Sequence, residues 1–86
     1  PNPFNSQVNI KVTLPAGIYA SDFSMKIYNI LGEVVKTFEI NDNNRSVIEL
    51  HWEGKNDNNE ELASGIYIFT VRGQGFSKSI KLVYMK

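Results

Sequence analysis

Apolar and polar residues alternate along most of the chain, which is the two-residue period of a half-buried β-strand. In residues 8–14 the apolar side chains Val, Ile, Val and Leu alternate with Asn, Lys and Thr. Pro15-Ala16-Gly17 ends this strand, because proline cannot donate to a strand ladder and glycine tolerates turn geometry. The same alternation predicts a second strand over residues 23–28.

The middle of the chain predicts two more strands separated by a polar turn. A tight connection at Asn29–Gly32 leads into a third strand over Glu33–Ile40, where the adjacent Val34 and Val35 leave the inward face ambiguous. Asn41–Asn44 has the composition of a turn, since Asn and Asp accept left-handed backbone conformations. A fourth strand follows, with Ile48, Leu50 and Trp52 on one face and Val47, Glu49 and His51 on the other.

Two longer strands end the chain. Residues 65–71 are apolar on both faces, as expected of a central strand. Gly73-Gln74-Gly75 predicts a hairpin, and the last strand runs over Phe76–Met85 with Ile80, Leu82 and Tyr84 on one face. The best helical candidate, residues 58–63, is too short and lacks an apolar stripe.

Six or seven short strands at a spacing of about ten residues predict an all-β fold, an immunoglobulin-like antiparallel β-sandwich. The 86 residues allow one domain, residues 1–86, with one core. The opening residues have neither the charged nor the apolar region of a signal peptide, so we expect a fragment of a larger protein whose main activity lies upstream.

Composition removes several classes of function. Lysine plus arginine equals aspartate plus glutamate at nine each, which argues against nucleic acid and anionic lipid as partners. Without cysteine there is neither a disulfide framework nor a thiolate metal site. No apolar run approaches the roughly 20 residues needed to span a bilayer.

Candidate chemistry is sparse, and we predict no catalytic residue, cofactor, metal site or small-molecule substrate. The only histidine, His51, is expected on the outer face of its strand. Carboxylates and amides gather over residues 56–61, but their spacing does not match a calcium-binding EF-hand, and a solvated turn with a left-handed Asn59 is the better interpretation. A sugar-binding platform of aromatic rings is a further alternative, although the alternation places most of these rings in the core: Trp52, Tyr67, Phe69 and Tyr84.

Four segments carry a family resemblance when they are taken together and in order. They are Pro1-Asn2-Pro3-Phe4-Asn5, Ile27–Val35, Trp52–Asn56 and Ala63–Tyr67. They resemble the type A C-terminal sorting domain of the type IX secretion system and the closely similar immunoglobulin-like domain of the flagellar hook-capping protein. The family pattern after the tryptophan is approximately Trp-Asp-Gly-x-Asp-x-x-Gly, and here Glu53, Asn56 and Asn59 stand in the two Asp places and the last Gly place.

The resemblance and the chemistry of the motif residues are compatible. Gly32 suits a tight hairpin, Gly65 lets the chain enter the central strand, and Tyr67 can bury its ring while its hydroxyl finds a partner. The residues that carry the motif, and that we expect to be structural, are Pro1, Asn2, Pro3, Phe4, Gly32, Trp52, Gly54, Gly65 and Tyr67.

The resemblance implies a secretion signal carried behind a cargo domain and recognised by proteins of an outer-membrane export machinery. The cargo would pass the periplasm and outer membrane of a Bacteroidota-like Gram-negative bacterium, to the cell surface or the medium. The last strand is the expected recognition element, through edge pairing and side-chain pockets, and its candidate residues are Lys78, Lys81, Leu82, Val83, Tyr84, Met85 and Lys86. Two alternatives stay open: a structural assembly domain of the hook-capping type, and a carbohydrate-binding accessory module of a secreted enzyme.

Overall fold

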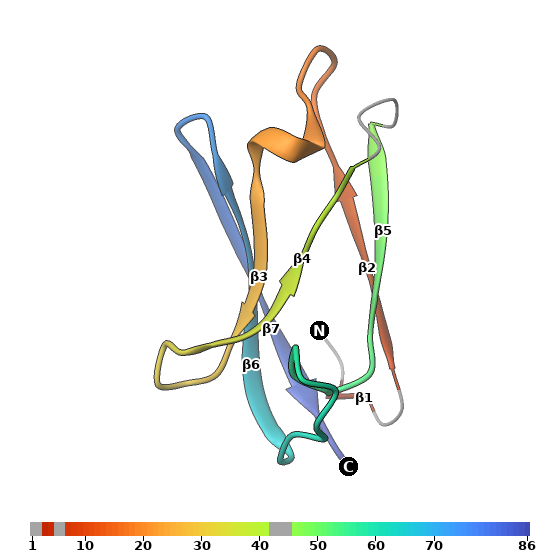
Figure 1. Cartoon of the computed structure of the whole chain (residues 1–86), viewed down its shortest axis with the longest axis vertical. Coiled ribbons are helices and arrows are strands. Elements are labelled where there is room, and N and C mark those ends of the chain that lie inside the picture. Colours follow the sequence, from red (N-terminus) through yellow and green to blue (C-terminus); the bar gives the residue numbers. More distant parts are fainter. Residues whose placement is uncertain (1–2, 5–6, 42–45) are drawn as a thin grey trace.

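Seven strands in two facing sheets make up the fold in the computed structural model, which describes residues 3–4, 7–41 and 46–86 (Figure 1). The larger sheet has the order β1-β7-β6-β3-β4, and the smaller sheet pairs β2 with β5. The strands are β1 (Pro3–Phe4), β2 (Val8–Thr13), β3 (Ser24–Tyr28), β4 (Val34–Phe38), β5 (Val47–Trp52), β6 (Gly65–Gly73) and β7 (Phe76–Tyr84). The predicted β-sandwich is therefore confirmed.

The core lies between the two sheets and is built by the alternation read from the sequence. Ile48, Leu50 and Trp52 of β5 are buried, while the residues between them are exposed. They belong to one apolar cluster with side chains of the facing sheet, and its members are Ile10, Leu14, Ala20, Met25, Ile27, Ile48, Leu50, Trp52, Tyr67, Phe69, Val71, Leu82 and Tyr84. No helix in the described ranges is long and apolar enough to cross a membrane.

The strand β1 was not predicted, and it departs from a purely antiparallel sandwich. It pairs in parallel with the end of β7, with Pro3 beside Val83 and Phe4 beside Tyr84, whereas the other pairings between the strands described here are antiparallel. Two residues are too few to show an alternating pattern, which explains why the sequence analysis missed this strand. A proline is compatible with β1 because the strand lies at a sheet edge.

A β-bulge resolves the ambiguity of the two valines in β4. Ile27 of β3 pairs with Lys36 and Tyr28 pairs with Val34, so Val35 is the extra residue between two pairs. Val35 packs against the core, and Val34 is exposed. The bulge thus shifts the alternation of inward and outward side chains by one residue. This shift explains why the sequence did not show which of the two valines faces the core.

The connections differ in two places from their predictions. Gly73 belongs to β6, and the hairpin turn is the pair Gln74-Gly75, with φ values of 54° and 72°. Positive φ at both central residues is typical of the type I′ turn that suits a two-residue hairpin. A single 3-10 turn, η1 (Ala20–Asp22), leads into β3. Most of the predicted polar turn at 41–44 lies outside the described residues.

Candidate interaction surface

The predicted recognition residues of the last strand divide into two groups. Leu82 and Tyr84 are buried in the core, with 2% and 3% of their surface exposed. Val83, between them, is half-buried. The exposed members of the set are Lys78, Lys81, Met85 and Lys86. The structure therefore places five of the seven residues on β7, with Met85 and Lys86 directly after it, and presents only part of the set to solvent.

Three aromatic side chains fix the end of β7 to the rest of the fold. The rings of Trp52 and Tyr67 meet edge to face at 5.2 Å between centroids, and Tyr84 lies 6.0 Å from Trp52 and 6.4 Å from Tyr67. Each such pair contributes about 0.5–1.5 kcal/mol beyond its buried area. These three residues, one from each of β5, β6 and β7, are named here the aromatic lock.

Gly54 leaves the space that the aromatic lock needs. A Cβ atom at this position would lie less than 3.0 Å from three ring carbons of Tyr84, and the backbone has a φ of 75°. Both the contact and the backbone conformation therefore require glycine. The Trp52 Nε1–H donates to the carbonyl oxygen of Lys55 at 2.8 Å, which holds the following loop against the lock. The Trp-x-Gly motif thus leaves room for the ring of Tyr84, the last residue of β7.

Tyr67 forms the corner that is typical of immunoglobulin-type sandwiches. Its hydroxyl donates to the carbonyl oxygen of Ala63, four residues upstream, at 2.7 Å. Burial, and secondly the neighbouring Tyr84, raises the pKa of the Tyr67 phenol. The expectation that Tyr67 buries its ring and pairs its hydroxyl is confirmed.

The C-terminal end of the chain is tied to the loop between β5 and β6. The backbone N–H of Lys86 donates to Ser64 Oγ at 2.8 Å. The ammonium group of Lys86 lies 3.7 Å from a carboxylate oxygen of Glu61, and both side chains are about half exposed. This exposed ion pair adds little stability, but together the two contacts place the last residues beside the motif loop.

Two turns far apart in the chain have the same hydrogen bonds. Asn29 Oδ1 accepts from the backbone N–H groups of Leu31 and Glu33, and its Nδ2 donates to the Glu33 carboxylate. Asn56 makes the equivalent three bonds, to the backbone of Asn58 and Glu60 and to the Glu60 carboxylate. The sequence signal is a repeated Asn-x-x-Gly/Asn-Glu, which the sequence analysis missed.

The fourth residue of each turn has a positive φ, 82° at Gly32 and 65° at Asn59. The left-handed conformation expected for both residues is confirmed. The Asn- and Glu-rich segment 56–61 is therefore a hydrogen-bonded turn, and among the described residues no group of three His, Cys, Asp or Glu side chains has the geometry to hold a metal ion.

The second of these turns closes the outer edge of the larger sheet. The backbone N–H of Asp57 donates to the carbonyl oxygen of Val35, the bulge residue, at 3.0 Å. Its carboxylate accepts from the backbone N–H of Thr37 at 3.0 Å and lies 3.9 Å from the ammonium group of Lys36. Asp57 thereby occupies polar groups of the edge strand β4, which would otherwise be open to another strand.

The histidine and the aromatic rings considered as candidate binding residues have structural positions in the sandwich. His51 lies on the exposed face of β5, where its Nδ1 is hydrogen-bonded to Asn9 Oδ1 of the paired strand. The rings of the proposed sugar platform are each at most 6% exposed, so they cannot stack on a saccharide at the surface: Trp52, Tyr67, Phe69 and Tyr84. The motif residues Pro1 and Asn2 lie outside the described residues.

A comparison with protein-family models finds a match over residues 1–85 to the family described as the secretion system C-terminal sorting domain. No curated protein and no solved structure matches the chain. The match covers nearly the whole chain and includes all four segments that carry the resemblance. The chain therefore belongs to the family of secretion system C-terminal sorting domains.

Proposed function

We propose that an outer-membrane protein of the export machinery recognises the exposed residues near and directly after the C-terminal end of β7, namely Lys81, Met85 and Lys86. The domain itself is a C-terminal sorting signal for type IX secretion, which is the function of its family. A sorting domain of this kind implies a cargo joined upstream and export to the cell surface or the medium. The proposal adds which side chains the machinery contacts.

The observation that carries the proposal is the exposure of an apolar side chain, Met85, that lies in the sequence between two exposed lysines, Lys81 and Lys86. Met85 is 48% exposed directly after the end of β7, next in sequence to the exposed Lys86. Lys81 lies on the outer face of the larger sheet, because its partner in β6 is the outward Ile68. An exposed apolar side chain with exposed lysines close to it in the sequence has the composition expected of a contact that combines a side-chain pocket with charge complementarity.

Deleting the last residues cannot test this proposal by itself. Removal of Lys81–Lys86 also removes Leu82 and Tyr84, two core side chains, and loss of one large core side chain costs about 2–5 kcal/mol. If the truncated protein were not exported, the cause could be either an unfolded domain or the loss of the recognised residues. Substitutions confined to exposed positions are needed.

The test is a double variant, Lys81→Glu with Met85→Asp, in the full cargo protein. The matched control makes the same two changes elsewhere: Arg72→Glu on the same outer face, and Leu31→Asp at a turn residue that is 79% exposed. We expect the first variant to retain cargo in the periplasm and the control to export it. Because all four positions are at the surface, each substitution should leave the free energy of unfolding within about 0.5 kcal/mol of the wild-type value. Normal surface display of the first variant would refute the proposal.

A further inference from the structure

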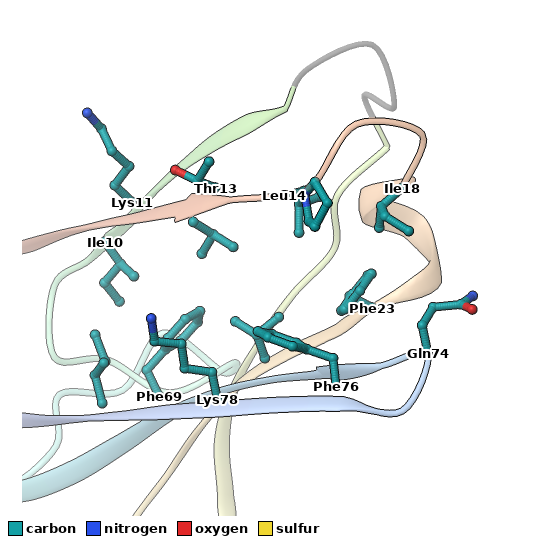
Figure 2. A pocket seen from close by; sticks show the side chains of 14 residues that line it. Ile10, Lys11, Thr13, Leu14, Ile18, Phe23, Phe69, Gln74, Phe76 and Lys78 are labelled. Atoms are coloured by element: carbon teal, nitrogen blue, oxygen red, sulfur yellow. The ribbon is translucent and has the colours of Figure 1, made fainter.

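An apolar groove lies between the two sheets on the side where β2 and β7 face each other (Figure 2). Its volume is about 450 Å³. Ile10 of β2 and Leu14, which follows that strand, line it from one side, and Phe69 lines it from the larger sheet. The groove is open to solvent: Phe76 and Ile80, which line it from β7 together with Lys78, are 48% and 37% exposed.

The groove coincides with an unpaired strand edge. On the side of β7 away from β6, β1 pairs only with Val83 and Tyr84. Along Phe76–Leu82 no strand in the described parts of the chain pairs with this edge. A strand added there would lie between β7 and β2, so it would satisfy backbone groups and cover the groove at the same time.

The direction and register of β1 indicate where such a strand comes from. The two pairs between β1 and β7 are parallel and share an offset of 80 positions. A chain that continues β1 backwards in this register places the residue before Pro1 beside Ile80 and the fifth residue before Pro1 beside Phe76. A chain continued in this register would run along the open edge and over the groove.

We propose that the five residues preceding Pro1 in the parent protein form a parallel strand against Phe76–Ile80 of β7 and close this groove. The inference rests on the proposed function, in which a cargo is joined upstream of the domain. The first, third and fifth residues before Pro1 would face the groove, because paired residues of neighbouring strands point to the same side. The first and fifth should be apolar, and the third, beside Lys78, should be polar or acidic.

The proposal changes the boundary and the mechanics of the domain. The sorting module begins before Pro1, and the cargo is joined to it through a hydrogen-bonded strand of the sheet instead of a free tether. Two other occupants are conceivable for the groove, a second copy of the chain and a strand of the receptor, and the test below separates them from the upstream segment.

The test uses cysteine pairs in the full parent protein, since the domain itself contains no cysteine. Neighbouring strands are about 4.8 Å apart, within the range that a disulfide bridges. Lys78→Cys is combined with a cysteine at the third residue before Pro1 and, as the mismatched control, at the second residue, whose side chain faces away. With a thiol oxidant we expect at least tenfold more intramolecular disulfide in the matched pair.

A second matched pair, Ser77→Cys with the fourth residue before Pro1, guards against a folding defect at position 78, because both side chains lie on the solvent face. Equal cross-linking of matched and mismatched pairs, or none in either matched pair, would overturn the inference. Cross-linking between molecules would assign the groove to a second copy and would also overturn it. Cargo export is measured in the same strains. If the cargo is exported but neither matched pair forms a disulfide, only the proposed strand is refuted. If a matched pair forms a disulfide but cells do not export the unsubstituted protein, only the proposed function is refuted.

Discussion

Replacing Gly54 by alanine tests the packing that holds the last strand in place. The new Cβ would lie within 3.0 Å of the Tyr84 ring, at a backbone φ of 75°. The left-handed conformation costs a non-glycine residue about 1–2 kcal/mol, and overpacking of a core typically costs about 1–3 kcal/mol. We therefore expect Gly54→Ala to lower the free energy of unfolding by about 2–5 kcal/mol. A domain of this length has roughly 4–13 kcal/mol in total.

Gly32→Ala is the matched control, because Gly32 has nearly the same φ, 82°, with no atom within 4 Å of the added Cβ. It should cost only the conformational term of about 1–2 kcal/mol. The assay is urea unfolding followed by the fluorescence of Trp52, the only tryptophan. With a slope of about 1 kcal/mol/M, the midpoint should fall by about 1–2 M for Gly32→Ala and by about 2–5 M for Gly54→Ala. Equal midpoints for the two variants would refute the claim that the Tyr84 ring fills the space above Gly54.

Two further predictions concern the hydroxyl of the aromatic lock and the closed sheet edge. Tyr67→Phe removes the bond to Ala63 and should cost about 1 kcal/mol at neutral pH. Because the native pKa of Tyr67 is raised, the contribution of this residue to stability should be constant below about pH 10 and be lost as the pH rises through the native pKa. The variant should therefore show a shallower fall in stability in alkaline urea titrations. A steeper fall in the variant would contradict this. Asp57→Ala should cost about 1 kcal/mol through the lost bond to Thr37, whereas Asp57→Asn, which keeps an acceptor, should cost less than half of that in thermal unfolding. If the two Asp57 variants unfold alike, the carboxylate does not close the edge through this bond.

The alternation of side chains was sufficient to predict the strands that line the core. It located β2, β3 and β5 within two residues of their bounds, because one face of each is buried and the other is wet. The same alternation distinguishes the buried from the exposed residues among the predicted recognition residues. Leu82 and Tyr84 share a strand face with other apolar positions, so they belong to the core and not to the exposed surface. The role of Trp52 as a core residue followed from the same pattern.

Features that depend on contacts between distant segments were not readable in this way. The strand β1 exists only through its pairing with β7, which is 80 positions away, and a bulge at Val35 breaks the period of β4. The contact of Asp57 with β4 depends on where the loop lies in space. In contrast, the repeated turn at Asn29 and Asn56 could have been found by comparing the two segments directly.

The sorting role is tested most directly by transferring the domain. Residues 1–86, preceded by the ten residues that lead into them in the parent protein, are fused to the C-terminus of an unrelated periplasmic reporter in a bacterium with an active type IX system. The fraction of reporter on the cell surface or in the medium is then measured. We expect the reporter to be exported with the domain and to stay in the periplasm without it. Retention of the fusion in the periplasm, in cells that export their own cargo normally, would contradict the account.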